Sequence, residues 1–206
     1  MRKLLLIGAG GHGRVAADCA EAMGCFSEIS FADASYPNNT HNSHWRIIGD
    51  DSYWSHYIEH YEFIVSIGNN QARLALSEKI EQLGGKLATL IHPQATISKY
   101  ANIGAGSVVF ANAAINVNCQ LGVATIVNTG ATIDHDCTIG NGCHIAPGVN
   151  ISGTTTLGNR VWVGVGSTII QNLSLTDDVY IGAGAVIVND LKQSGTYVGV
   201  PAKRIK

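Results

Sequence analysis

An aliphatic residue recurs at every sixth position from Ile97 to Ile187 without interruption. A second track, made mostly of small residues, lies two positions before each member of the first, from Ala95 to Ala185. Side chains two positions apart on a strand point to the same side, so both tracks are expected to face the interior. Hexapeptide repeats are typical of parallel β-helices, in which three hexads form one triangular coil, and they predict a column of about five coils.

The chain before this repeat has a different pattern, in which apolar strands alternate with amphipathic helices. Strands are predicted at 3–7, 28–32, 62–67 and 86–91, and helices at 14–23, 51–59 and 71–83. The alternation indicates a small parallel sheet of Rossmann type. The polar, turn-rich segment 34–47 is predicted to be a mobile loop. We therefore expect an α/β Rossmann-like domain over residues 1–91 and an all-β parallel β-helix with a C-terminal tail over residues 92–206.

A glycine-rich turn joins the first predicted strand to the first predicted helix. It contains Gly10, Gly11 and His12, and the free amides and dipole of the following helix would make it an anion site suited to a diphosphate. Because a short glycine motif is weakly specific, a turn that merely packs remains the alternative. Asp33 follows the second strand, where it could accept a hydrogen bond from a ribose or a base, or cap its own loop.

Composition narrows the classes of function. Charged residues make up 14% of the chain and the net charge is −2, which argues against nucleic-acid binding. The apolar run at 3–7 is too short for a signal peptide or a membrane span, so we expect no membrane partner.

Three of the five cysteines, Cys119, Cys137 and Cys143, fall on the small inward track, where buried packing is expected, with a disulfide or a nucleophile as the alternatives. The cytoplasm is the expected compartment.

Outward positions of the repeat carry the candidate chemistry. His135 and Asp136 follow Ile133 at a predicted corner, and Gly153 lies eighteen residues after His135, beside it in the next coil. A neutral imidazole can accept a proton near pH 7, and an adjacent carboxylate would fix its tautomer and raise its basicity. Glycine at 153 would let a ligand approach the backbone. Solvent-facing corner residues without a role are the alternative.

His144 is predicted on the face opposite the corner that carries His135. Both imidazoles could therefore serve one site only if they came from different chains. Ile126 and Trp162 flank His144 in the neighbouring coils, and outward apolar side chains favour an interface, so we expect a homotrimer with clefts between columns. Two histidines nine residues apart make a poor zinc site, and no metal is expected.

Four segments together resemble one family. They are the Gly10-Gly11-His12-Gly13 turn, the segment from Ile67 to Arg73, Asn128-Thr129 leading to His135-Asp136, and the tail from Gly199 to Lys203. They are similar to the hexapeptide-repeat sugar O- and N-acyltransferases typified by sialic acid O-acetyltransferase and the UDP-4-amino-sugar N-acetyltransferases of the bacillosamine pathway. The resemblance implies a left-handed β-helix, a nucleotide sugar in the N-terminal domain, and acetyl-CoA along the column between two subunits.

The resemblance also implies roles for individual residues. His135 looks like the general base, with Asp136 where the family has a supporting Glu or Asp. Contacts with acetyl-CoA are implied for His144, Gly153, Val165, Ala183 and Lys203. Contacts with the nucleotide sugar are implied for Gly10, Gly11, His12, Asp33, Gly68, Asn69 and Arg73.

The expected function is acetyl transfer from acetyl-CoA, without a covalent intermediate, to the 4-amino group of a UDP-linked amino sugar. Sialic acid or another sugar could instead be O-acetylated, and both kinds of transfer stay open. Two further classes are a nicotinamide-dependent oxidoreductase, which would use the same glycine turn, and a non-catalytic β-helix scaffold.

Overall fold

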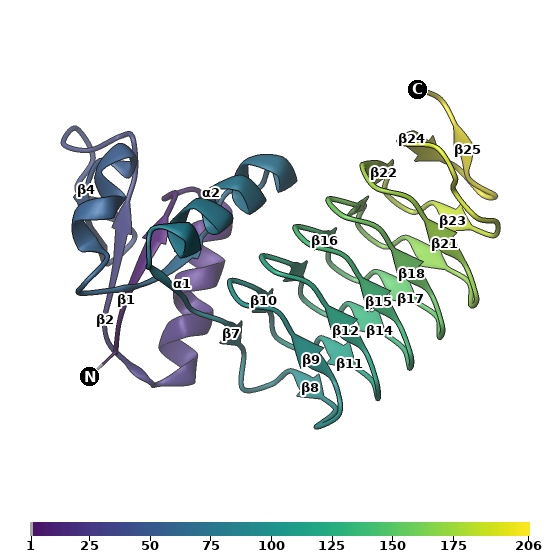
Figure 1. Ribbon diagram of the computed structural model, residues 1–206, viewed down its shortest axis with the longest axis horizontal. Coiled ribbons are helices and arrows are strands. Elements are labelled where there is room, and N and C mark those ends of the chain that lie inside the picture. The colour runs from purple at the N-terminus through teal and green to yellow at the C-terminus, as the bar shows by residue number, and fades with distance from the viewer. Residues whose placement is uncertain (1) are drawn as a thin grey trace.

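The computed structural model describes residues 2–206 and shows a layered α/β domain followed by a long column of coils (Figure 1). The elements of the first domain are β1 (Arg2–Ile7), α1 (Gly11–Met23), β2 (Phe26–Ala32), β3 (His41–Asn42), β4 (Trp45–Gly49), the 3₁₀ helix η1 (Asp51–Tyr57), β5 (Glu62–Val65), α2 (Asn70–Gln82) and β6 (Lys86–Leu87). The sheet has the order β3-β4-β2-β1-β5-β6. Every pair in it is parallel except β3 with β4.

Apolar side chains explain why these strands form the centre of the domain. Residues 4–7 of β1 are almost fully buried, and so are Phe31 on β2 and Phe63 on β5. Helix α1 begins directly after the glycine turn, without a side-chain cap, and ends at Gly24, whose φ of +64° suits glycine. The carboxyl ends of β1, β2 and β5 therefore meet at one edge of the sheet, as in other parallel α/β folds.

Two predicted elements of this domain are wrong. The segment 34–47, predicted as a mobile loop, contains β3 and the start of β4, which form a hairpin that extends the sheet beside β2. The strand predicted at 86–91 is divided in two. Its first part is β6, which ends the α/β sheet, whereas β7 (Leu90–Ile91) pairs with β10 (Val108–Val109) and begins the column.

The column confirms the sixfold repeat. Its strands from β8 to β23 are short and recur at the predicted interval, and each pairs in parallel with a strand eighteen residues away, as Ile133 does with Ile151. They form three sheets with the orders β7-β10-β13-β16-β19-β22-β24-β25, β8-β11-β14-β17-β20-β23 and β9-β12-β15-β18-β21. Their bounds are β8 (Thr96–Ile97), β9 (Asn102–Ile103), β10 (Val108–Val109), β11 (Ala114–Ile115), β12 (Gln120–Leu121), β13 (Ile126–Val127), β14 (Thr132–Ile133), β15 (Thr138–Ile139), β16 (His144–Ile145), β17 (Asn150–Ile151), β18 (Thr156–Leu157), β19 (Trp162–Val163), β20 (Thr168–Ile169), β21 (Ser174–Leu175), β22 (Val179–Ile181), β23 (Val186–Ile187), β24 (Gly195–Val198) and β25 (Lys203–Arg204). The aliphatic and small tracks fill the interior together.

One column of corner positions has a left-handed backbone. Asn118, Asp136, Thr154 and Asn172 lie eighteen residues apart, and their φ angles are between +56° and +62°. Asparagine and aspartate tolerate this conformation better than most residues with a side chain. The corner beside His135 therefore has a fixed shape that is repeated in four successive coils.

The two domains are packed against each other through apolar surface. Ile126 on β13 is only 1% exposed, because it lies in one cluster with Val108, Phe110 and residues of α1. The prediction that Ile126 is an outward apolar residue free for another subunit is therefore wrong, since the N-terminal domain of the same chain covers it.

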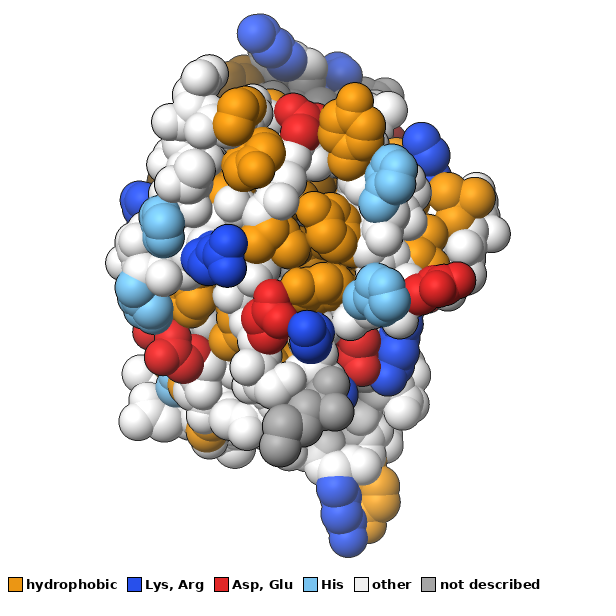
Figure 2. Space-filling view, turned by 90° about the vertical axis from the view of Figure 1, so that its left-hand side faces the viewer, with side chains coloured by type: hydrophobic (Ala, Val, Ile, Leu, Met, Phe, Trp, Pro, Cys, Tyr) orange, Lys and Arg blue, Asp and Glu red, His pale blue; other side chains and the backbone are white. Residues whose placement is uncertain are grey.

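Beyond the last full coil, β24 (Gly195–Val198) and β25 (Lys203–Arg204) form an antiparallel hairpin at the far end of the column (Figure 1). Such a hairpin caps an otherwise open stack of coils. On the face of the molecule formed by the α/β domain, acidic, basic and histidine side chains are interspersed with apolar ones (Figure 2). No helix within residues 2–206 is both long and apolar enough to traverse a bilayer.

Candidate active site

His135 and Asp136 form a hydrogen-bonded pair at the corner between β14 and β15. The distance between His135 Nδ1 and Asp136 Oδ2 is 2.8 Å, so the aspartate reaches the imidazole. Both side chains are about half exposed. The hydrogen bond that Asp136 accepts from His135, aided by the charge of Asp134, raises the pKa of His135 above its usual value. The pair has the geometry of a general base supported by a carboxylate.

The imidazole of His135 is also held from the next coil. A Cβ atom on Gly153 would lie 2.6 Å from His135 Nε2, which is far inside van der Waals contact. Gly153 was expected to leave open space for a ligand, but the imidazole itself occupies that space. The glycine is therefore required by His135, and its assignment to acetyl-CoA remains a prediction.

His144 lies on β16, in the sheet opposite the corner of His135, as the repeat predicts. It is 7% exposed, because its ring contacts Trp162 and His12, with centroid distances of 4.2 and 6.1 Å. Burial, with smaller contributions from the charges of Arg73 and His12, lowers the pKa of His144 to about 3. The imidazole is therefore neutral at physiological pH.

The tautomer of His144 follows from its neighbour Asn128. The backbone amide of Thr129 donates to Asn128 Oδ1, so the Nδ2 group of Asn128 is left to face His144 Nε2, at 3.3 Å. With Nε2 accepting, the proton belongs on Nδ1. Nδ1 is buried and has no hydrogen-bond partner within residues 2–206. An unpaired buried donor is costly, so a substrate oxygen is a reasonable acceptor for it.

The glycine turn, Asp33 and the segment after β5 meet at the carboxyl edge of the α/β sheet. Gly10 and Gly11 are exposed at the start of α1, and a Cβ atom on Gly13 would lie 2.4 Å from the carbonyl oxygen of Gly8, so the close turn requires glycine there. Asp33 Oδ2 accepts a hydrogen bond of 2.7 Å from the amide of Ala9, and Oδ1 accepts one from the amide of Ser35. Asp33 thus caps its own loop, as the alternative interpretation held, and fixes the turn.

Arg73 does not reach a ligand in this arrangement. Its side chain is 1% exposed, and its guanidinium donates to the carbonyl oxygens of Ala124, Gly142 and Cys143 in the column. Burial lowers the pKa of Arg73 to about 10, which still leaves it cationic. The expectation that Arg73 contacts the nucleotide sugar is therefore replaced by a structural role: it fastens α2 to the column.

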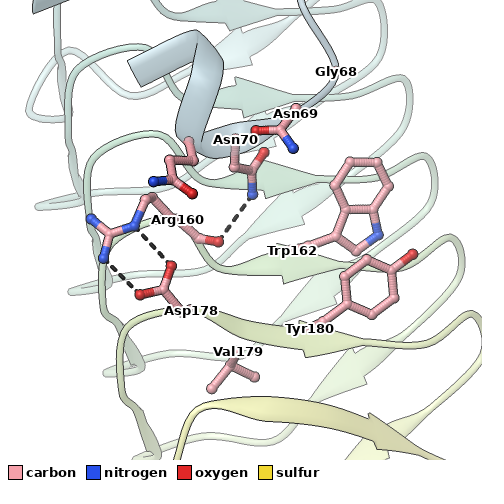
Figure 3. Close-up of a pocket in the computed structure, with 9 residues that line it drawn as sticks. Gly68, Asn69, Asn70, Arg160, Trp162, Asp178, Val179 and Tyr180 are labelled. Atoms are coloured by element: carbon pink, nitrogen blue, oxygen red, sulfur yellow. Dashed lines mark hydrogen bonds and ion pairs between the residues drawn. The ribbon is translucent and has the colours of Figure 1, made fainter. Parts of the chain in front are cut away.

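A cavity of about 340 Å³ lies where the start of α2 faces the column (Figure 3). Gly68 and Asn69, which were predicted to contact the substrate, line it from the α/β domain. The column contributes Trp162 and Tyr180, whose rings are stacked with centroids 5.6 Å apart and an interplanar angle of 5°. Arg160 and Asp178 form a two-point ion pair at the other side, with bonds of 2.8 and 2.7 Å.

The sequence interpretation did not identify the ring pair or the ion pair of this cavity as units. Their signal was present, because Trp162 and Tyr180, like Arg160 and Asp178, are eighteen residues apart and must lie in adjacent coils.

The other residues assigned to acetyl-CoA follow one side of the column. His144 on β16, Val165 after β19, Ala183 after β22 and Lys203 on β25 lie in order along a single sheet. The last three are exposed. With neighbouring strands about 4.8 Å apart, four steps span about 19 Å.

Cysteines and metal ligands do not add to this site. Cys119, Cys137 and Cys143 are buried on the inward track, and all five cysteines are free thiols. Burial raises the pKa of the Cys143 thiol to about 12, which makes it a poor nucleophile. Within residues 2–206 no three side chains of the kinds that bind metal are grouped together.

Comparison with known proteins adds independent findings. Residues 3–80 match the family model of the PglD N-terminal domain. UDP-N-acetylbacillosamine N-acetyltransferase of Bacillus subtilis (strain 168) is 28% identical over 113 residues, which are 54% of this chain and 52% of that protein. The chain thus spans about half the length of this curated relative.

Solved structures match over the whole chain. The acetyltransferase domain of PglB from Neisseria gonorrhoeae FA1090 has a TM-score of 0.95 and 40% identity, with full coverage of both chains. The same domain in complex with acetyl coenzyme A has a TM-score of 0.94 and 41% identity over 99% of each chain. A mutant of perosamine N-acetyltransferase from Caulobacter crescentus, in complex with CoA and GDP-perosamine, has a TM-score of 0.94 and 33% identity, covering 100% of this chain and 98% of that one.

Proposed function

Because the chain belongs to the hexapeptide-repeat sugar N-acetyltransferases, we propose that it transfers the acetyl group of acetyl-CoA to the 4-amino group of a UDP-linked amino sugar. The acetyl donor is supported by the PglB domain, whose complex contains acetyl coenzyme A. The UDP carrier is supported by the name of the Bacillus subtilis relative. The Caulobacter crescentus complex contains GDP-perosamine, which makes GDP the carrier to test in parallel.

In the proposed reaction the sugar amine attacks the thioester carbonyl directly. His135 accepts the proton that the amine loses as the C–N bond forms, and Asp136 stabilises the resulting imidazolium. The C–S bond then breaks, and the CoA thiolate takes the proton from His135. No covalent enzyme intermediate is needed, which agrees with the buried positions of the inward cysteines.

His144 is proposed to stabilise the negative charge that develops on the carbonyl oxygen. Its neutral ring carries the proton on Nδ1, an atom without a partner in the described chain. A preorganised donor of this kind is worth about 10²- to 10³-fold in rate in comparable sites. Because Nδ1 is covered in the free chain, its surroundings, which include His12, have to open when substrate binds.

The complete site is proposed to lie between two chains of a homotrimer. His135 and His144 face away from each other within one column, since one is at the corner opposite the other's sheet. A neighbouring column could bring its own His144 to His135, and the path from His144 to Lys203 would then bind acetyl-CoA in the cleft.

Free thiols at all five cysteines are consistent with a cytoplasmic reaction.

The observation that carries this proposal is the hydrogen-bonded pair of His135 and Asp136 beside Gly153. The direct test is to incubate the purified chain with acetyl-CoA and, in separate reactions, a UDP-linked 4-amino sugar, a GDP-linked 4-amino sugar or a UDP-linked sugar without the amine, and to measure the products by mass spectrometry. A gain of one acetyl group on the UDP sugar is expected. Acetylation of only the GDP sugar would replace the carrier, and acetylation of a hydroxyl on a sugar without the amine would replace N-transfer by O-transfer.

Substitution of the base provides the first prediction. His135→Ala should lower kcat by about 10²- to 10⁴-fold, the usual contribution of general-base catalysis, and leave KM for both substrates almost unchanged. The measurement is steady-state kinetics on a variant whose circular dichroism matches the wild type. A variant that keeps wild-type kcat would remove the base assignment.

A further inference from the structure

The carboxylate of Asp136 is engaged at both oxygens. Oδ2 is 2.8 Å from His135 Nδ1, and Oδ1 accepts a hydrogen bond of 3.0 Å from the side-chain amide of Asn118. Asn118 belongs to the preceding coil and lies eighteen residues before Asp136, at the same corner. Asn118, Asp136 and His135 therefore form a continuous line of hydrogen bonds across two coils.

A second pair of side chains, Asn116 and Asp134, supports the backbone of His135. Asn116 donates to Asp134 Oδ1 at 2.7 Å, and Asp134 Oδ1 also accepts the backbone amide of His135 at 2.8 Å. With Gly153 on the following coil making room for the imidazole, three successive coils hold His135. Of these two sets of hydrogen bonds, the one that runs from Asn118 through Asp136 reaches the imidazole ring, whereas the other reaches the backbone amide of His135.

Asp136 needs such support because, within residues 2–206, the imidazole of His135 is the only other group that is hydrogen-bonded to its carboxylate. It is 49% exposed, and the last torsion of an aspartate is broad and two-fold, so water would compete for its oxygens. Asn118 has a fixed position from which to act, because its backbone shares the left-handed corner conformation, with φ of +62°. Its amide can be oriented before substrate arrives.

We propose that Asn118 is a positioning residue for acetyl transfer, which holds the carboxylate of Asp136 in the orientation that supports His135. This inference rests on the proposed function, in which His135 is the base. Asn118 does not contact the substrate, and it acts only through Asp136.

The electrostatics agree with this geometry. The hydrogen bond from Asn118 is the largest cause of the lowered pKa of Asp136, so it keeps the carboxylate ionised. The ionised carboxylate in turn raises the pKa of His135. The other titratable groups that act on this imidazole are Asp134 on its own coil and Cys119 on the preceding one. Loss of the Asn118 amide should therefore lower the pKa of His135.

The test replaces Asn118 by glycine, which accepts the left-handed backbone and removes only the amide. The matched control is Asn172→Gly, because Asn172 lies at the same corner with φ of +60°, two coils beyond Asp136. Asn118→Gly should lower kcat about tenfold, the smaller of the effects usual for partners that orient a functional group, without changing KM. Asn172→Gly should leave both unchanged. Wild-type kcat in Asn118→Gly, or an equal loss in the control, would overturn the proposal.

A double-mutant cycle separates positioning from general stabilisation of the coil. In an Asp136→Asn background, Asn118→Gly should change kcat less than about twofold, because its partner is already altered. A loss of the same size in both backgrounds would show that Asn118 acts independently of Asp136 and would contradict the proposal.

A measurement without turnover keeps this inference distinct from the proposed function. Histidine proton NMR across a pH titration should show a lower His135 pKa in Asn118→Gly than in wild type and in Asn172→Gly. An unchanged His135 pKa would refute the positioning role even if the enzyme is active. Absence of acetyl transfer by the wild-type chain would refute the proposed function and leave this titration to decide whether Asn118 orients Asp136.

Discussion

At the scale of single residues, Gly153 determines whether His135 has room. Its missing Cβ would lie 2.6 Å from His135 Nε2, so alanine at this position has to displace the imidazole. We expect Gly153→Ala to lower kcat by about 10²-fold, because a shift of about 1 Å in a reacting group has that effect, while thermal unfolding stays near wild type. Gly153→Ser should be at least as damaging. Undiminished kcat in both variants would show that the imidazole works from another position.

The pH dependence of the reaction is set by the same pair. His135 acts as a base only when it is unprotonated, so kcat/KM should fall as the pH drops through its pKa. Asp136 raises that pKa, and Asp136→Asn, which keeps a residue suited to the left-handed corner, should lower it. The acidic limb of the profile should therefore move to lower pH while the plateau decreases. A limb that stays in place would assign the titration to another group.

The contacts that the sequence predicted correctly are those that the repeat fixes. His135 and Asp136 are adjacent in the chain, and Gly153 is one coil away, so their proximity follows from spacing alone. Arg73 could not be assigned in this way. Its acceptors at Ala124, Gly142 and Cys143 lie 51 to 70 residues further along the chain, and only the packing of α2 on the column brings them to it.

At the scale of elements, the aliphatic residues at every sixth position predicted the column. The segment 34–47 has no such periodicity, so the hairpin of β3 and β4 was not predicted. The segment 34–47 is polar because it contains β3, the edge strand of the sheet, and exposed sheet edges commonly carry polar side chains. Ser43, with φ of +59°, makes the turn between them, and serine is an uncommon residue for that conformation. Pairing of β4 with β2 depends on distant residues, which local turn composition does not reveal.

The attachment of α2 to the column gives a prediction about stability. Arg73→Met keeps much of the apolar volume but leaves the carbonyl oxygens of Ala124 and Gly142 in the column without their donors. We expect a loss of about 3 kcal/mol or more in the free energy of unfolding, measured by denaturant titration. The matched control is Lys79→Met, because Lys79 is an exposed cation in the last turn of the same helix, and it should change stability by less than about 0.5 kcal/mol. Equal stability of both variants would contradict the role of Arg73 in fastening α2.

At the scale of the whole molecule, exposure could not be predicted from the repeat because the N-terminal domain covers part of the column. Ile126 occupies an outward position and was expected to face another subunit, yet it is buried against its own chain. His144 is 7% exposed beside His12, so its surroundings have to open before a neighbouring chain can use it. Half-buried Trp162 and exposed Tyr180 are what remains of the predicted outward apolar stripe on that sheet. The choice among an acetyltransferase, an oxidoreductase and a scaffold was decided by family membership, since the fold alone is compatible with several functions.

A site shared between chains can be tested by mixing two inactive variants. If each site takes His135 from one chain and His144 from the next, a trimer assembled at random from equal amounts of His135→Ala and His144→Phe has both histidines intact in about one quarter of its sites. His144→Phe keeps a ring against Trp162 and removes the hydrogen-bonding nitrogens. Co-refolded mixtures should therefore recover up to about a quarter of wild-type kcat, whereas variants mixed after separate assembly should recover none.

Light scattering should give about 65 kDa, three times the 21.7 kDa chain, for every preparation. Because a site built within one chain would lack one histidine in every copy, failure of the co-refolded trimer to recover activity would contradict a site shared between chains.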